Sequence, residues 1–348
     1  MRPRVYLDYN ATAPLREEAR AAMIAAMDVV GNPSSVHAEG RSAKAIVERA
    51  RAQINEALGA SGADVIFTSS ATEAAALACA GRKFSGASIE HDAVGAWITS
   101  DLPVNPAGQV NVSDPGHTTL QLANSETGII QSLPSGLALC DATQAFGKRP
   151  FGFAWSDVHM MMVSAHKIGG PKGIGALVVR EGLDLEAQIK GGGQEMGRRS
   201  GTENVIGIAG FGAAAEAAAR DLTNGVWDRV AELRNILEKT IEAATRQTIF
   251  VGQAEERLAN TTCMLTPGWK GETQVMAMDL AGFAISAGSA CSSGKVKASR
   301  VLSAMGFDEV EAASAVRVSL GPETTEDEIM RFADAWLAAE KKFRARAA

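Results

Sequence analysis

One lysine, Lys167, stands where its amine could act as a nucleophile. It ends an apolar run, MMMVSAH, and a glycine-rich stretch, IGGPKGIG, follows it directly. An amine shielded from water in this way has a lowered pKa, because desolvation penalises the charged ammonium. A neutral amine can form a Schiff base with an aldehyde. The pattern therefore indicates a lysine that holds an aldehyde cofactor, although the segment alone would also suit a surface lysine in a turn.

Two other strand ends carry groups that suit the same kind of cofactor. Asp141 follows the apolar run LALC and could face a pyridine nitrogen and keep it protonated. Thr72, in FTSSATEAAAL, could begin a helix whose free N–H groups and hydroxyls receive a phosphate. Each residue alone would also suit an ordinary helix cap or turn. Because anion site, carboxylate and lysine recur in chain order at successive strand ends, together they predict a pyridoxal phosphate site.

Among the four cysteines, Cys291 has the surroundings of a reactive thiol. It lies in GSACSSGKVK, where small polar residues and lysines favour an exposed thiolate. Cys79, Cys140 and Cys263 lie in apolar or Ala-rich patterns, so we expect them to be buried hydrophobic side chains. No two cysteines form a CxxC pair, and the sequence predicts neither a metal site nor a disulfide framework.

Regular elements are expected to position these residues. The runs DVIFT, ASI, LQLA, LALC and MMMVSA are each followed by small or polar residues, which is typical of buried parallel strands whose C-terminal ends carry chemistry. Helical spacing predicts helices over about 15–30 and 41–58, the second ending at Gly59. An Ala-rich helical region near 205–245, the strands TTCML, FAIS and AVRVSL, and a final helix from about 325 indicate a smaller α+β domain.

The composition is that of a folded protein of roughly two domains. The chain has 348 residues, 46% of them hydrophobic, and a formal net charge of −6. This acidic balance, without a basic run, argues against a nucleic-acid partner. No stretch of about 18 uncharged apolar residues and no signal peptide is found, so we expect a cytoplasmic protein without a membrane partner.

Ten motifs follow one another along most of the chain. They are YLDYNATAPL at 6–15, GNPSS at 31–35, FTSSATE at 67–73, EHDAV at 90–94, NSETG at 124–128, DATQ at 141–144, SAHKIGGPKGIGAL at 164–177, GGGQEMGRRSGTEN at 191–204, SAGSACSSG at 286–294 and VRVSLG at 316–321. In this order they resemble the motifs of the cysteine desulfurases, the NifS/IscS-like group of the class V aminotransferase superfamily. The resemblance implies an α/β protein of fold type I, the aspartate aminotransferase-like fold of pyridoxal-phosphate-dependent transferases. It implies a large cofactor-binding domain with a mostly parallel sheet at 13–215, and a small α+β domain made of 1–12 and 216–348.

The same resemblance implies contacts to the ring of pyridoxal 5′-phosphate. Lys167 matches the Schiff-base lysine of the family, and Asp141 matches the partner of the pyridine nitrogen. Gln144 matches the residue near the ring hydroxyl. His91 matches the histidine that stacks on the ring and shuttles protons.

For the phosphate, the resemblance implies contacts from both subunits of a homodimer. Thr72, Ser164 and His166 match phosphate ligands, and the backbone at Ala71 joins them. Thr202 matches a threonine that reaches the phosphate bound to the other subunit, so the active sites would be shared.

For the substrate, L-cysteine, the resemblance implies that Arg317 clamps the carboxylate with its bidentate fork. Asn124 and Ser125 match further substrate contacts. The Cys291 thiolate would attack the substrate sulfur, leaving L-alanine and a persulfide for a sulfur acceptor, for example in iron–sulfur cluster assembly. The acceptor is not identified by the sequence.

Several features depart from the family pattern. Ser125 replaces the second of two asparagines, and the chain is shorter than its relatives within 92–123 and 129–140. The second shortening leaves too few residues between two parallel strands for the dozen or so that a helical crossover needs, so one peripheral helix is expected to be missing. The family's C-terminal tail, which docks a scaffold protein, is also expected to be absent.

Two other functions remain open from the sequence. One is a different class V enzyme, an aminotransferase or a lyase acting on selenocysteine or cysteine, whose products would not depend on Cys291. The other is a non-catalytic paralogue that binds pyridoxal phosphate without turnover. The product formed from cysteine distinguishes them.

Overall fold

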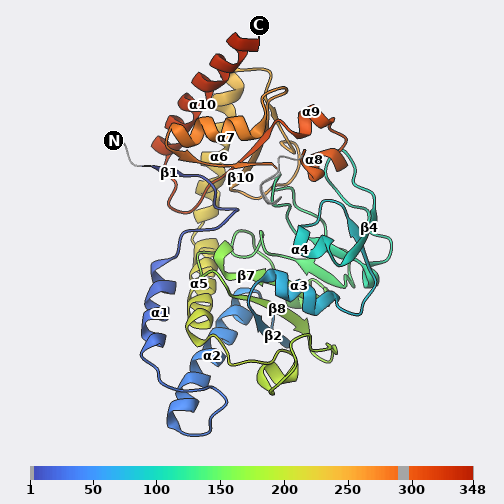
Figure 1. Cartoon of the computed structure of the whole chain (residues 1–348), viewed down its shortest axis with the longest axis vertical. Helices are drawn as coiled ribbons and strands as arrows, with labels where there is room; N and C mark the ends of the chain where they lie inside the picture. Colours follow the sequence, from blue (N-terminus) through green and yellow to red (C-terminus); the bar gives the residue numbers. More distant parts are fainter. Residues whose placement is uncertain (1–3, 289–297, 348) are drawn as a thin grey trace.

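The computed structural model describes residues 4–288 and 298–347, and its centre is a five-stranded sheet (Figure 1). Four of the five strands run in one direction, and only β8 runs antiparallel to both of its neighbours. The predicted α/β fold with a mostly parallel sheet is confirmed. In spatial order the strands are β2 (Ala63–Thr68), β8 (Gly175–Arg180), β7 (Met160–Ser164), β6 (Leu139–Asp141) and β5 (Thr119–Gln121).

Both faces of this sheet are buried, which explains the continuous apolar runs of its strands. In β7, Met161 and Val163 pack into one core, while Met160 and Met162 pack into the core on the opposite face. The first face is covered by α1 (Glu17–Met27), α2 (Ala38–Ala57) and α5 (Val205–Thr223), and the second by α3 (Ala71–Cys79).

A pair of parallel strands extends the sheet region beyond β5. This pair is β3 (Phe84–Ala87) and β4 (Ile98–Leu102), and a bridge between Ser85 and Thr118 joins it to the residue before β5. The short helix α4 (Asp92–Gly95) lies between the two strands in sequence. Four 3₁₀ turns complete this part of the chain: η1 (Pro115–His117), η2 (Phe153–Trp155), η3 (Ala165–Lys167) and η4 (Gln194–Gly197).

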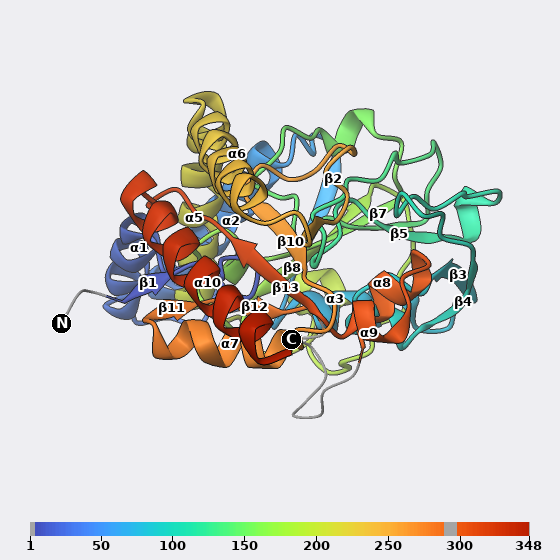
Figure 2. The same ribbon diagram turned by 90° about the horizontal axis from the view of Figure 1, so that it is seen from above.

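A second, antiparallel sheet forms with the C-terminal part of the chain (Figure 2). Its strand order is β12 (Ser286–Ala287), β13 (Ala315–Ser319), β10 (Thr261–Leu265) and β9 (Ile249–Phe250). Its helices are α6 (Val226–Ala244), α7 (Gly271–Leu280), α8 (Arg300–Ala304), α9 (Glu309–Ala312) and α10 (Glu326–Ala347).

The N-terminal residues pack with the elements around this second sheet. Strand β1 (Val5–Tyr6) pairs in parallel with β11 (Phe283–Ala284), and Val5 and Leu7 belong to the apolar core that also holds Trp336. The domain boundaries at 13–215, and at 1–12 with 216–348, stay a prediction.

Two expected elements are divided in the structure. The Ala-rich helical region is two helices, α5 and α6, because Gly225 adopts a left-handed φ of 70° between them, a conformation that favours glycine. The expected strand FAIS is likewise divided into β11 and β12. Gly59, with φ of 55°, follows the end of α2 as predicted.

The connection from β5 to β6, residues 122–138, contains no helix, as predicted, although it is longer than the dozen or so residues that a helical crossover needs. Segment 104–110 contacts it instead: the Gln131 amide accepts a hydrogen bond from Val110 N at 3.0 Å and donates one to Gly108 O at 2.7 Å. No helix in the described ranges is long and apolar enough to cross a membrane.

Candidate active site

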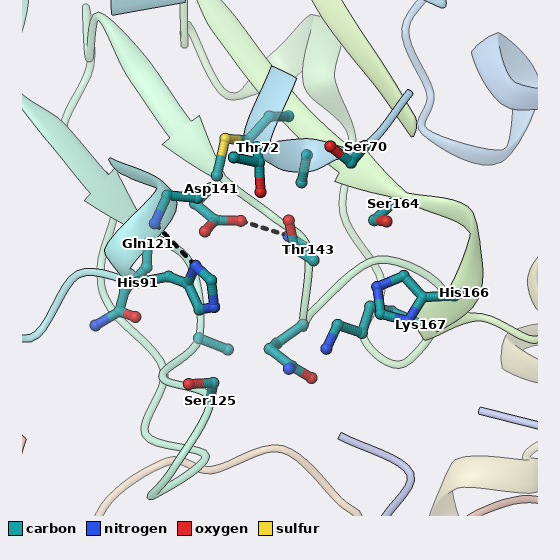
Figure 3. A pocket seen from close by; sticks show the side chains of 15 residues that line it. Ser70, Thr72, His91, Gln121, Ser125, Asp141, Thr143, Ser164, His166 and Lys167 are labelled. Atoms are coloured by element: carbon teal, nitrogen blue, oxygen red, sulfur yellow. Dashed lines mark hydrogen bonds between the residues drawn. The ribbon is translucent and has the colours of Figure 1, made fainter. Parts of the chain in front are cut away.

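A cavity of about 260 Å³ lies where β6 and β7 end, beside the start of α3 (Figure 3). Residues at or just after the C-terminal end of each of the five strands predicted from the sequence line this cavity. Lys167 and Asp141 line this one cavity, as the sequence interpretation requires. The other predicted site residues that line it are Ala71, Thr72, His91, Ser125, Gln144, Ser164 and His166.

Lys167 lies in η3, directly after β7, and is half-buried. Its Nζ donates hydrogen bonds to the carbonyl oxygens of Asn10 at 2.6 Å and Ala11 at 3.0 Å. The amine is therefore held at the cavity by the backbone of the N-terminal segment, which lies about 157 positions away in sequence.

Asp141 is the last residue of β6 and is only 8% exposed. Its Oδ1 accepts a hydrogen bond from Thr143 N at 2.9 Å, which fixes the carboxylate at the cavity wall (Figure 3). The hydroxyl Oγ1 of Thr143 is buried and has no hydrogen-bond partner within the described residues. A buried polar atom without a partner costs free energy, so Thr143 suits a ligand that contacts it there.

The anion end of the cavity is built around the start of α3. The helix begins at Ala71, not at Thr72, because the Ser70 side chain caps it by accepting a hydrogen bond from Glu73 N at 3.2 Å. The N–H groups of Ala71 and Thr72 lie in the first helical turn, where no intrahelical acceptor exists. They lie at the positive end of the helix dipole, as a phosphate site requires.

Gly175 at the start of β8 allows this loop to approach the sheet closely. A Cβ at that position would lie 2.7 Å from the Ser70 carbonyl carbon and 2.9 Å from Ala71 N, so any larger residue would push the helix start away. Ser164, which pairs with Gly175, is buried at the same end of the cavity.

The two histidines of the site differ in their hydrogen bonding. His91 caps α4, and its Nδ1 accepts a hydrogen bond from Ala93 N at 3.1 Å, so in a neutral ring the proton is on Nε2. Burial, together with the charge of Lys167, lowers the pKa of His166 to about 4. His166 is therefore neutral at pH 7, and its Nδ1 lies 3.2 Å from the Thr12 hydroxyl.

Asn124 does not line the cavity, in contrast to the substrate contact predicted for it. Its Oδ1 accepts hydrogen bonds from Glu126 N at 2.9 Å and Thr127 N at 3.0 Å, and its Nδ2 donates to Ile89 O at 3.3 Å. Both ends of the amide are thus used to shape the loop, and we interpret Asn124 as a residue that positions Ser125.

Arg317 lies in β13 and is buried, with only 5% of its surface exposed. Its guanidinium donates to Asp8 Oδ1 at 2.8 Å and to the backbone oxygen of Ser125 at 3.0 Å. Its Nε is buried without a hydrogen-bond partner within the described part of the chain. The guanidinium is therefore fixed directly behind Ser125, which lines the cavity.

Besides Asn124 and Arg317, two further predicted site residues are not among those that line this cavity. Thr202 is exposed and lines a separate hollow beside Arg199 and Asn204. Cys291 lies outside the described residues. The other three cysteines are buried, as predicted.

Sequence analysis missed several residues that complete the site. Gln121, Thr143 and Met162 line the cavity, and Asn10 provides the carbonyl that Lys167 contacts. Asn10 and Thr143 lie within the motifs at 6–15 and 141–144, which was the only signal for them. Gln121 and Met162 lie inside apolar strands, where periodicity marks them as core.

Comparison with known proteins shows similarity along most of the chain. A family profile described as aminotransferase class-V matches residues 5–93 and 118–332. The chain is 36% identical to a cysteine desulfurase from Cereibacter sphaeroides, over 94% of this chain and 93% of the relative. It is 34% identical to a cysteine desulfurase IscS from Dictyoglomus turgidum, over 94% of this chain and 92% of the relative.

Solved structures give the same result. The X-ray structure of a NifS-like protein from Rickettsia africae has a TM-score of 0.87 and 30% identity, covering 97% of this chain and 99% of that one. The profile match is interrupted at 94–117, within the segment predicted to be shorter than in relatives. These similarities confirm the resemblance that the ten motifs indicated.

The three described cysteines are expected to resist alkylation in the native protein. Burial raises the pKa of Cys79 and of Cys263 to about 12, and it raises the pKa of Cys140 well above its ordinary value. At pH 8 with iodoacetamide, peptide mass spectrometry should find these thiols unmodified in the native state and modified in urea. Rapid native-state labelling of any of them would contradict the burial.

His166 is expected to make the cofactor-free protein less stable in acid. Its pKa of about 4 in the folded chain is below the ordinary 6.5, so the unfolded chain binds the proton first as pH falls. Stability contributed by neutral His166 is therefore lost between about pH 6.5 and 4. Urea unfolding should show wild type losing stability relative to His166→Gln between pH 7 and pH 5; a constant difference would contradict the assignment.

Proposed function

The chain belongs to the class-V aminotransferase family, and on that premise we propose that it is a cysteine desulfurase that uses pyridoxal 5′-phosphate. It converts L-cysteine to L-alanine and leaves the sulfur as a persulfide on Cys291. The observation that carries this proposal is the single cavity in which the Lys167 amine, the Asp141 carboxylate and the start of α3 meet.

The residues of the cavity fit this cofactor. Lys167 supplies the amine for its aldehyde, and Asp141 supplies the carboxylate for its ring nitrogen. The first N–H groups of α3 with the hydroxyls of Thr72 and Ser164 provide donors for its phosphate. Thr143, whose hydroxyl has no described partner, supplies one more group at the wall. When bound, the cofactor withdraws electrons from the α-carbon of an attached amino acid.

The catalytic steps of the chain's own residues follow from their chemistry. Lys167 would hold the aldehyde of the cofactor, and with L-cysteine in the site its Nζ would be the base that takes the proton from the α-carbon of the substrate. His166 is neutral at pH 7, so no positive charge on its ring repels the proton that Lys167 accepts. Asp141 keeps the ring nitrogen protonated.

Sulfur transfer is assigned to Cys291. Its thiolate attacks the sulfur of the substrate, so that an S–S bond forms as the Cβ–S bond breaks. The carbon fragment keeps the electron pair of the broken bond, takes up a proton there and leaves as L-alanine. No external oxidant is needed, because the two electrons that sulfur gives up in forming the S–S bond stay with the carbon fragment, whose C–S bond becomes a C–H bond.

Arg317 is assigned to the substrate carboxylate. Its Nε is buried without a described partner, and its ion pair with Asp8 holds the guanidinium behind Ser125. A bidentate carboxylate contact would require one of these hydrogen bonds to be exchanged for the substrate. Ser125 offers its hydroxyl at the cavity in place of the asparagine amide of relatives.

The remaining assignments extend to partners. Thr202 is exposed on a loop outside the cavity, which is consistent with a contact to the phosphate held by a second subunit in a homodimer. The persulfide serves an acceptor protein, with iron–sulfur cluster assembly as the proposed destination and the cytoplasm as the proposed compartment.

Borohydride reduction should attach the cofactor permanently to Lys167. We expect the reduced holoenzyme to carry pyridoxyl phosphate on the peptide containing Lys167, as measured by mass spectrometry, and Lys167→Ala to carry none. Loss of this base should also lower the rate of alanine formation by about 10²- to 10⁴-fold. Lys172→Ala, a change of the exposed lysine nearby, is the matched control. Attachment at another lysine would overturn the assignment.

The product assay separates the proposed function from other class V reactions. With L-cysteine, wild type should form alanine and gain the mass of one sulfur on Cys291, whereas Cys291→Ala should form neither a persulfide nor sulfide catalytically. Cys79→Ala, which alters a buried thiol, is the control and should retain persulfide formation. A keto acid product, or full sulfide release by Cys291→Ala, would indicate an aminotransferase or a lyase instead.

A further inference from the structure

A second lysine, Lys148, is buried directly behind the cavity. It is 4% exposed, and its Nζ donates to Gln144 Oε1 at 3.1 Å and to Asn10 Oδ1 at 3.3 Å. Both of these acceptors are neutral amide oxygens, and no ion pair of Lys148 with a carboxylate is found in the described ranges. Burying an amine without a counter-charge is costly, so stability alone does not explain this lysine.

The two neighbours of Gln144 fix the direction of its amide. The backbone carbonyl oxygen of Asn10 can only accept, so the Gln144 atom that contacts it at 3.0 Å is Nε2. Gln144 Oε1 then faces Lys148 Nζ, which donates to it. The Nε2 nitrogen has two hydrogens, and only one is used by Asn10. Because Gln144 lines the cavity, the second hydrogen is available to a ligand there.

Hydrogen bonds to Asn10 connect Lys148 and Gln144 with Lys167. Its carbonyl oxygen accepts from Lys167 Nζ and Gln144 Nε2, and its side-chain oxygen accepts from Lys148 Nζ and from Asn260 Nδ2 at 3.0 Å. Burial, reinforced by the charges of Lys167 and Arg317, lowers the pKa of Lys148 well below its ordinary value. A neutral amine has two N–H groups, which matches the two amide oxygens that it contacts.

We propose that Lys148 is a positioning residue that holds Gln144 with its amide nitrogen toward the ring oxygen of the cofactor. This inference rests on the proposed function. An N–H donor stabilises an ionised ring oxygen, whereas an amide oxygen would repel it. Without the donor at Lys148, the Gln144 oxygen loses its buried partner and the side chain turns away. The ring oxygen then holds the adjacent imine proton more tightly.

The test is a pH titration of the visible absorbance of the lysine-bound cofactor. In Lys148→Met, which keeps the length of the side chain but has no N–H, the midpoint should rise by about 1 pH unit, since a net hydrogen bond is worth about 1 kcal/mol. Gln144→Leu should raise it similarly, and the double variant should add nothing further. Lys148→Gln, which keeps a donor, should titrate near wild type.

The outcomes separate this inference from the proposed function. If wild type shows no lysine-bound cofactor absorbance, the proposed function fails and this inference fails with it. If wild type binds the cofactor but Lys148→Met titrates like wild type, only the inference is overturned. An equal shift in Lys148→Met and Lys148→Gln would also overturn it, because packing and not the donor would then be responsible.

Unfolding of the cofactor-free proteins checks the buried amine independently. Because the folded pKa of Lys148 is lowered, the unfolded chain binds its proton up to about pH 10.4 and wild type gains stability as pH rises. The stability of Lys148→Met minus that of wild type should therefore fall between pH 7 and pH 10. A difference that stays constant would show that the amine is not buried as described.

Discussion

The site depends on one geometric constraint, that adjacent parallel strands end at the same edge of a sheet. Strands β6 and β7 are parallel neighbours with Asp141 opposite Met162, so Asp141 and the residues that continue β7 toward Lys167 emerge together. Strand β8 runs the other way, so its first residue, Gly175, lies at this edge and admits the start of α3. Carboxylate, amine and anion site therefore share a cavity although they come from distant parts of the sequence.

The N-terminal segment connects this edge to the second layer. Residues of β1 pair with β11, and shortly afterwards Asp8 holds Arg317 while the Asn10 carbonyl holds Lys167 and Gln144. One short stretch of chain thus positions the proposed substrate clamp and the proposed nucleophile relative to each other. Its burial explains why a segment that contributes no predicted catalytic side chain carries one of the ten motifs.

The sequence predicted what burial and local spacing determine. Continuous apolar runs located β2, β6 and β7. The absence of a helix between β5 and β6 was also expected, but from a connection taken to be shorter than residues 122–138, which the structure shows. Contacts between distant residues could not be read in this way: the internal hydrogen bonds of Asn124, the pairing of Arg317 with Asp8, and the network around Asn10 each depend on tertiary packing. The start of α3 at Ala71 followed from capping by Ser70, which competed with Thr72 as a candidate cap.

The central claim is that Asp141 and Lys167 face the same bound ring from two sides of one cavity. The most direct measurement is the ¹⁵N NMR shift of the pyridine nitrogen in holoenzyme loaded with labelled pyridoxal phosphate. The account predicts a protonated ring nitrogen at pH 8 in wild type and an unprotonated one in Asp141→Ala, because only the carboxylate stabilises that proton. The same shift in both proteins would contradict it.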